Sequence, residues 1–412
     1  MAIDKKVLNV PHLRFPEFSE EWEICKVSEL LDFYSTNSLS WEQLEYGTKA
    51  IMNLHYGLIH VGLPTMVDLT RDNLPNIKED NMPKNFELCK EGDVAFADAS
   101  EDTNEVAKPI EFFDLAGKNI VCGLHTIHGR DNKNKTVIGF KGYAFSSSAF
   151  HNQIRRIAQG TKIYSISTKN LSECFIGIPS KVEQTKIATL LRLIDERIAT
   201  QNKIIEDLKK LKSAIIDYAI NSLDTDFAKF GSLYETAGEG GTPTTSNTSF
   251  YDNGKIPFVK IDDLKQKYLT ENKDFITELG LQKSSAWLVP TRSILFSNGA
   301  SIGEITITTY PVCTKQGILG IVPKSNIDVE FLYYFMSSTY FKKAISRIVT
   351  EGTMKTAYLK DINNILCPIP TKEKQQGIAK MPSDLNSKID YEQSLLKLFI
   401  MQKQYLLRQM FI

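Results

Sequence analysis

The chain has 412 residues, of which 42% are hydrophobic and 24% are charged, and its formal net charge is zero. These values indicate a globular protein of two or three domains and exclude a disordered chain. No apolar run approaches the length of a membrane span, and the N-terminus lacks the apolar core of a signal peptide, so we expect a cytoplasmic protein. Six scattered cysteines without a CxxC pair predict buried free thiols.

The first half of the chain contains an acidic segment followed by a basic one. Residues 87–114 carry nine acids against two lysines, whereas residues 118–169 carry nine bases against one acid. The basic segment includes the polar and aromatic residues of "GYAFSSSAFHNQIRRIAQGTKIYS", which suit a phosphate-contacting surface. A solvated face that is balanced by the acidic segment in space is an equally good interpretation.

A long helical pattern occurs twice. The stretch "IPSKVEQTKIATLLRLIDERI" begins at Ile178, and "IPTKEKQQGIAKMPSDLNSKI" begins 191 residues later, at Ile369. Apolar residues at steps of three and four predict amphipathic helices over 181–222 and 372–411, each about 60 Å long. The predicted packing positions are Ile187, Ile194, Ile198, Ile205, Leu208, Ile215, Leu385, Ile389, Leu396, Phe399 and Leu406. Leu190 and Met381 also coincide on this apolar stripe.

Two polar breaks in the stripe also coincide, Gln201 with Glu392 and Lys212 with Lys403. Stripes of this length need a partner, and the nearest candidate for each helix is the other copy. The breaks then either select the register or lie at a helix edge. Pro382 removes a backbone hydrogen bond from the second helix, which predicts a kink there or a new helix that starts at Pro382.

The repeat extends beyond the helices. Residues 147–161 match 337–353, and "GDVAFADAS" (92–100) matches "RSILFSNGAS" (292–301), where both read as a turn, a short strand and a small-residue loop. The chain thus has two halves joined at about 221–232, each a mixed β-rich domain followed by a long helix. Because residues 63–86 have no counterpart, we expect two sites of one type with two specificities.

At this point the chain resembles the specificity subunits of type I restriction-modification systems. The resemblance rests on the ordered set of "VPHLRFPEFSEEWE" (10–23), "QGTKIYSISTKNLSECFIGIPSKVEQTKIA" (159–188), "GEGGTPTTSNTSFYDNGKIPFVKIDDL" (238–264) and "LVPTRSILFSNGASIG" (288–303). It implies an α+β fold with two target recognition domains, separated by two long helices packed as an antiparallel coiled coil with internal pseudo-two-fold symmetry. The implied boundaries are 1–178 and 224–369 for the domains, and 179–223 and 370–412 for the helices.

The resemblance also implies a non-catalytic subunit that reads a split double-stranded DNA site and recruits two adenine methyltransferase subunits. A restriction subunit, the translocase and nuclease, joins that assembly. The chain itself needs no cofactor, because S-adenosylmethionine is bound by the methyltransferase partner.

Two similar units related by an approximate two-fold axis would face DNA in opposite orientations, so we expect a bipartite target with an unread spacer whose length the helices set. Bases would be read by side chains that reach major-groove edges. The candidate DNA contacts are Arg130, Lys133, Lys135, Arg155, Arg156, Lys162 and Tyr164 in the first domain, and Lys260, Ser297, Asn298, Lys315, Gln316, Lys342, Lys343, Arg347 and Lys355 in the second.

No sequence motif indicates an enzyme. The chain contains neither a Walker A sequence nor an NPPY-like tetrapeptide, and "HTIH" (His125, His128) lacks a third metal ligand in the sequence. The acids of "FADASEDTNE" (96–105) suit solvated acids or readers of cytosine better than a nuclease metal site, and "GEGGT" (238–242) suits a turn. A stand-alone DNA-processing enzyme and a coiled-coil scaffold without a DNA role are the alternative functions.

Overall fold

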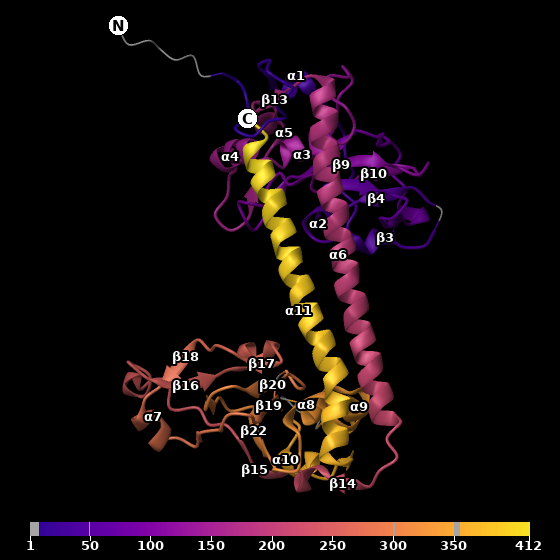
Figure 1. Ribbon diagram of the computed structural model, residues 1–412. Coiled ribbons are helices and arrows are strands. Elements are labelled where there is room, and N and C mark those ends of the chain that lie inside the picture. Colours follow the sequence, from indigo (N-terminus) through magenta and orange to yellow (C-terminus); the bar gives the residue numbers. More distant parts are fainter. Residues whose placement is uncertain (1–7, 49, 300, 350–354) are drawn as a thin grey trace. The chain divides into compact units, whose positions relative to one another are not determined.

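The computed structural model describes residues 8–48, 50–299, 301–349 and 355–412. The chain divides into two compact units, the first formed by Met1–Asn202 with Leu395–Ile412 and the second by Lys203–Ser394. Each unit therefore contains one end of each long helix (Figure 1). Residues 300 and 350–353 of the expected repeats lie outside the described residues.

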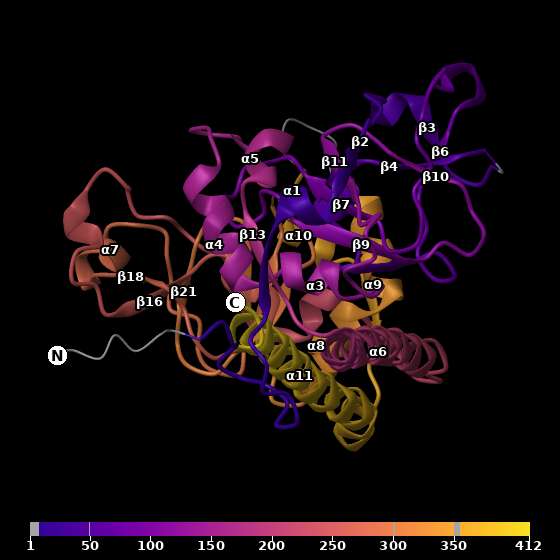
Figure 2. The same cartoon turned by 90° about the horizontal axis from the view of Figure 1, so that it is seen from above.

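The first unit is built on a five-stranded sheet in the order β2-β11-β7-β9-β5. Figure 2 shows β2, β11, β7 and β9 side by side in this order. The bounds of its strands are β2 Asp32–Tyr34, β11 Thr126–Arg130, β7 Val94–Ala97, β9 Pro109–Asp114 and β5 Met66–Asp68. A second sheet has the order β10 (Ile120–Cys122), β4 (Met52–Leu54), β6 (Asn76–Ile77) and β3 (Leu44–Glu45). Two further pairs are β1 (Glu23–Lys26) with β13 (Phe175–Ile178), and β8 (Ala99–Ser100) with β12 (Tyr164–Ser165).

The second unit is built on a five-stranded sheet in the order β15-β22-β19-β20-β17. Its strands are β15 Tyr234–Glu239, β22 Ile318–Pro323, β19 Ile294–Ser297, β20 Ile305–Thr308 and β17 Tyr268–Leu269. A smaller sheet has the order β18 (Asp274–Ile276), β16 (Ile256–Val259) and β21 (Cys313–Thr314), and β14 (Phe227–Lys229) pairs with β23 (Leu366–Pro368).

Short helices connect these strands. In the first unit they are α1 Val27–Leu30, α2 Tyr56–His60, α3 Lys141–Phe145, α4 Ser148–Ile157 and α5 Thr168–Ser172, with 3-10 turns at Trp41–Gln43 and Glu79–Asn81. In the second they are α7 Glu278–Gln282, α8 Val329–Ser337, α9 Thr339–Ile348 and α10 Leu359–Ile362, with 3-10 turns at Phe230–Ser232, Thr248–Phe250 and Ile261–Lys265. Ser147 and Ser338 cap α4 and α9 in the same way, each accepting a hydrogen bond from the third backbone N–H of its helix.

The two units share one strand topology. The central strand, β7 or β19, runs antiparallel to both of its neighbours, and the outermost pair, β5 with β9 or β17 with β20, is parallel. In the smaller sheets, β4 and β16 each have one parallel and one antiparallel partner. The internal repeat predicted from the sequence is therefore confirmed at the level of topology within each unit.

The long helices α6 (Lys181–Asn221) and α11 (Lys372–Gln409) agree with the predicted bounds to within two residues. All eleven predicted packing residues are buried or half-buried. Ile187 and Leu191 of α6 belong to the same core as Leu406 and Met410 of α11 in the first unit. In the described part of the chain no helix is both long and apolar enough to cross a bilayer.

The structure shows where the polar residues that interrupt the apolar stripe and Pro382 lie. Gln201 and Glu392 are buried, so an exposed helix edge does not explain them. Lys212 donates to Asn386 Oδ1 at 2.9 Å, and Lys403 pairs with Asp195 Oδ1 at 2.6 Å. Because α11 continues through Pro382, the predicted alternative of a new helix starting there is wrong.

Met381, the residue before this proline, does not lie on the apolar stripe as predicted. It is 58% exposed, although its counterpart Leu190 packs partly against the core of the first unit.

Candidate nucleic-acid interface

The candidate residues of the first unit lie at opposite ends of the five-stranded sheet. Thr126 pairs with Ala97 and Gly129 with Val94, so Arg130 lies at one end of the sheet. The ribbon of β8 and β12 follows Ala97 at the other end. Arg130, Lys133 and Lys135 therefore belong to one end, and Tyr164, in β12, belongs to the other.

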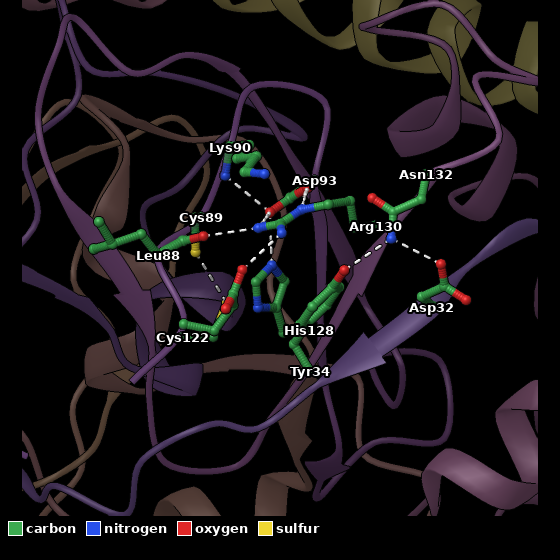
Figure 3. Close-up of polar contacts among 11 residues, drawn as sticks. Asp32, Tyr34, Leu88, Cys89, Lys90, Asp93, Cys122, His128, Arg130 and Asn132 are labelled. Carbon is green, nitrogen blue, oxygen red and sulfur yellow. Dashed lines mark hydrogen bonds and ion pairs between the residues drawn. The ribbon is translucent and has the colours of Figure 1, made fainter. Parts of the chain in front are cut away.

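The end that contains Arg130 is neutralised by acids. Arg130 is only 7% exposed and donates to both carboxylate oxygens of Asp93, at 2.9 and 2.8 Å, and to Glu87 Oε1 at 2.7 Å (Figure 3). Burial lowers the pKa of Arg130, but its hydrogen bonds to Asp93 and Glu87 outweigh this effect and raise the pKa overall. Arg130 is thus an interior ion-pair residue, contrary to its expected role as an exposed DNA contact.

Lys133 and Lys135 are also engaged at this end. The Lys133 ammonium donates to the carbonyl oxygen of Glu29 at 2.8 Å, and Lys135 pairs with Glu23 at 2.6 Å. Both lysines keep surface exposure, so their DNA contacts stay a prediction.

At the other end lies a hollow of 460 Å³ with a mixed lining, in which Lys108 pairs with Glu105 at 2.7 Å. Arg155 of α4, His151 and Lys108 line it, together with Thr65, Asn104, Glu105, Ser146, Ser148 and Gln404. Arg155 donates to Asn104 Oδ1 at 3.2 Å and stays exposed. Burial, and then the charge of Arg155, lowers the pKa of His151. Arg156 and Lys162 are exposed and form no salt bridge with any described residue, so their charges are available to a phosphate backbone.

The second unit has a corresponding hollow of 330 Å³ beside α9. Lys342 lies 191 positions after His151 and lines this hollow with Lys355, above an apolar floor that includes Phe296, Ile302 and Ile345. The same place in the two units therefore offers different chemistry, arginine and histidine among polar groups in the first and two lysines over apolar residues in the second.

The end of the central strand carries a different polar residue in each unit. The backbone carbonyl oxygen of Asp98 accepts a hydrogen bond from the N–H of Ile166 at 2.8 Å. In the second unit, the carbonyl oxygen of Asn298 accepts one from the N–H of Ala357 at 2.9 Å. Both N–H groups come from residues 191 positions apart, which confirms that Asp98 and Asn298 occupy equivalent places.

Ser297 and Asn298 are less than 2% exposed, contrary to the expectation that both contact DNA directly. Ser297 Oγ donates to the carbonyl of Ser301 and accepts from Glu304 N, and Asn298 Nδ2 donates to Ala357 O at 3.2 Å. The two side chains therefore hold the loop after β19 in place.

Exposed candidates surround this loop. Lys315 and Gln316 are exposed directly before Gly317, whose carbonyl accepts from Asn298 N at 3.0 Å. Lys343 and Arg347 are exposed on α9, whereas Lys260 forms a salt bridge with Asp274 at 2.8 Å. Most candidates of the second unit thus lie at its loop end or on the adjacent helix.

An aromatic and imidazole cluster near Asp98 was missed in the sequence. His125 is half-exposed, contacts Asp98 Oδ1 through Nδ1 at 3.0 Å, and packs edge-on against Tyr56 with ring centroids 5.1 Å apart. Trp41 is 46% exposed and packs on His55 at 4.5 Å. Exposed aromatic rings at such a site suit contacts with bases. The "HTIH" motif contains His125, but its spacing indicates at most a metal pair and does not reveal the ring contact with Tyr56.

The other sequence alternatives have structural explanations. His125 and His128 do not form a site together, because His125 bonds to Asp98 at the surface and His128 bonds to buried Asp93. Gly240 is required for close packing, since an added Cβ would lie 2.2 Å from the carbonyl oxygen of Thr314. A phosphate-binding role is therefore not needed to explain this glycine.

The acidic and basic segments meet partly inside the first unit. Arg130 pairs with Asp93, and Lys141 with the fully buried Glu111 at 3.3 Å. These two bases are therefore neutralised inside the unit, and the phosphate-contacting role of the exposed bases on and after α4 stays a prediction.

Comparison with known proteins finds similarity to one family. The family described as "Type I restriction modification DNA specificity domain" matches residues 224–398. The type I restriction enzyme MjaIX specificity subunit of Methanocaldococcus jannaschii is 25% identical over 62% of this chain and 64% of its own length. The putative MjaX specificity subunit of the same organism is 24% identical over 88% of this chain and 86% of its own.

The fold agrees with these matches. The crystal structure of a type I restriction-modification system S subunit from M. genitalium covers 98% of this chain and 99% of its own, with a TM-score of 0.53 and 18% identity. Its likeness concerns the fold. The matched domain and these relatives show that the chain is similar to type I restriction-modification specificity subunits.

Proposed function

We propose that this protein is the DNA sequence-recognition subunit of a type I restriction-modification complex. The observation that carries the proposal is the pair of corresponding hollows, one beside α4 and one beside α9, with different linings on a shared topology. One scaffold that presents two different sets of side chains suits two DNA half-sites of different sequence. The relatives named as specificity subunits support this assignment.

In this proposal the loop end of each unit faces DNA. Arg155, Arg156 and Lys162 in the first unit, and Lys342, Lys343 and Lys355 in the second, provide positive charge for phosphates and base edges. Contacts to phosphates fix the position of each unit, and contacts to base edges select the sequence. His125 and Tyr56 add candidate base contacts in the first unit.

The two long helices act as a spacer in this proposal. We expect α6 and α11 to pack as an antiparallel coiled coil and to relate the two recognition domains by a pseudo-two-fold axis. Support comes from within each unit, where apolar residues of both helices share a core. The helices would then fix the number of unread base pairs between the half-sites.

In this proposal, other subunits of the complex catalyse the methylation and the cleavage of DNA. Two methyltransferase subunits, which bind S-adenosylmethionine, would methylate adenines in the half-sites, and a restriction subunit would add translocation and cleavage. The similarity to specificity subunits supports a non-catalytic role, and the two units of one topology support a proposal of two methyltransferase subunits.

The test is to express this chain with its methyltransferase partner in a host without adenine methylation and to map N6-methyladenine by long-read sequencing. We expect one split motif that is methylated on opposite strands in its two halves. A stable complex without methylation, or methylation without a split motif, would contradict the proposal. Cleavage or methylation of DNA by the purified chain alone would favour a stand-alone enzyme instead.

A further inference from the structure

The core of the first unit contains two cysteines and a histidine whose donor atoms converge. Cys89 Sγ lies 3.5 Å from Cys122 Sγ, and one donor atom from each of Cys89, Cys122 and His128 lies within 4.8 Å of the others. All three residues are buried, at 5%, 1% and 0% exposure. They come from three separate segments, because Cys89 precedes β7, Cys122 ends β10 and His128 lies in β11.

The imidazole is oriented as a ligand would be. His128 Nε2 lies 2.7 Å from Asp93 Oδ2, and a carboxylate can only accept, so Nε2 carries a proton. The other ring nitrogen, Nδ1, is buried and has no hydrogen-bond partner. Figure 3 shows Nε2 turned toward Asp93 and the opposite edge of the ring on the side of the two cysteines. A metal-binding histidine usually donates its second N–H to a carboxylate in this way.

The carboxylate is itself fixed by the protein. Asp93 accepts from Arg130 through both oxygens and from Lys90 N at 2.8 Å. This network holds the ring in one orientation, in which Nδ1 has no hydrogen-bond partner. A buried nitrogen without a partner costs free energy, and a bound cation would remove that cost.

The fold does not require this donor set. By strand register and backbone hydrogen bonds, the equivalent places in the second unit are Val289, Thr314 and Gly320. There a Cβ on Gly320 would lie 2.5 Å from Val289 Cγ2, so the same space is closed by apolar packing. The two thiols and the imidazole are therefore particular to the first unit.

We propose that Cys89, Cys122 and His128 form a binding site for one thiophilic metal ion, Zn²⁺ or Cu⁺. Two sulfurs and one imidazole nitrogen are the ligand types that select these ions over Mg²⁺ or Ca²⁺. The ion would be held by the two thiolates after loss of their protons and by His128 Nδ1, with one position left for water or a further donor. It would tie together the segment before β7, strand β10 and strand β11, and thereby brace the side of the sheet behind the recognition loops.

The experiment measures metal content in the full chain purified without chelators, by inductively coupled plasma mass spectrometry. We expect about one zinc or copper per chain, and the element found distinguishes the two ions. The variants Cys89→Ser and Cys122→Ser should lose at least about tenfold in metal affinity. The matched control Cys174→Ser, another buried thiol in the same unit, should keep the metal.

A second readout uses the unmodified protein, so it does not depend on the folding of any variant. Titration with Co²⁺ should produce a thiolate-to-metal charge-transfer absorption, and chelation should lower the Tm. Substoichiometric metal together with no cobalt absorption would overturn the proposal, as would a Cys89–Cys122 disulfide in the purified chain or equal metal content in both cysteine variants and the control.

Discussion

Gln184 and Gln375, 191 residues apart, fix the first turns of the two long helices through the same three hydrogen bonds. Gln184 Nε2 donates to Pro179 O at 2.9 Å and Lys135 O at 3.1 Å, and Oε1 accepts from Val137 N at 2.9 Å. In the second unit, Gln375 bonds in the same way to Pro370 O, Asn326 O and Asp328 N, at 2.9, 3.3 and 2.7 Å. Both glutamines are at most 1% exposed, so each joins a helix to its recognition domain from inside the core.

We predict that Gln184→Ala and Gln375→Ala each destabilise their unit by at least about 3 kcal/mol. Each substitution leaves one backbone N–H and two carbonyl oxygens without the glutamine partner. An unsatisfied buried group lowers the free energy of unfolding by roughly 1–3 kcal/mol. Thermal and urea unfolding would measure the loss. The neighbouring Gln376→Ala is the control, because Gln376 is exposed and should change stability by no more than about 0.5 kcal/mol. Equal effects at Gln375 and Gln376 would contradict this account.

The charged groups around the hollow beside α4 lead to a second prediction. Arg155→Ala should weaken DNA binding by the assembled complex and lower the slope of log K against log salt by about 0.9 if the guanidinium contacts a phosphate. Lys133→Ala, at an exposed lysine at the other end of the same sheet, is the comparison, and it should change the slope less than Arg155→Ala if DNA faces the α4 end. A larger change in the slope for Lys133→Ala than for Arg155→Ala would mean that DNA binds at the end of the unit that contains Arg130, contrary to the proposal.

Substitutions of two arginines in the basic segment should have different effects, one on the free energy of unfolding and the other on DNA affinity. Arg130→Ala should cost about 3–5 kcal/mol of stability, because it leaves the buried carboxylate of Asp93 without its bidentate partner. Arg156→Ala should leave stability within about 0.5 kcal/mol and weaken DNA binding, because its side chain is exposed. Unfolding curves and salt titrations on both variants provide the check, and a stable Arg130→Ala protein with lost DNA affinity would reverse the assignment.

The sequence predicted periodic features well and long-range pairing poorly. The helix bounds and the packing positions followed from the repeat, since a long apolar period determines which face is buried. By contrast, Arg130 and Arg155 look alike in the basic segment. Only the register of β11 on β7 separates the end with buried acids from the exposed end.

The cysteines illustrate the same limit. Cys89, Cys122 and His128 are scattered in the sequence, and the bridge between Leu88 and Val121 and the pairing of β11 with β7 bring their segments together. Neither cysteine stands at a motif spacing from His128, so the sequence does not indicate that these three donors converge. Gln184 and Gln375 were visible in both copies of the repeat, but their burial depends on backbone groups about 50 residues earlier in the chain.

A pH dependence follows from His55. This residue is 3% exposed, and its Nδ1 accepts from Gly57 N at 3.1 Å as the N-cap of α2. Burial, and then the charge of His125, lowers its pKa, so the unfolded chain binds a proton more readily than the folded one. The stabilisation is complete above the unfolded pKa of about 6.5 and is lost as the pH falls through the lower folded value.

We therefore expect His55→Asn to flatten the decline in unfolding free energy between about pH 7 and pH 5.5, because asparagine caps a helix without titrating in this range. Some stability should be lost at all pH values, since the ring also packs on Trp41. His12→Asn, at an exposed position, should keep the unmodified pH profile. Parallel profiles for the His55 variant and the unmodified chain would rule out this titration as the cause.

The spacer role proposed for α6 and α11 leads to the last prediction. Four residues inserted in register into both helices, after Gln201 and after Ser394, would lengthen the pair by about 6 Å. At about 3.4 Å per base-pair step, the methylated motif should gain one or two unread base pairs while both half-sites stay the same. Four residues inserted into the connector after Ser222, outside both helices, should leave the spacer unchanged. Methylome sequencing reads both outcomes directly, and an unchanged spacer in the helix-insertion variant would mean that the helices do not measure the distance between the half-sites.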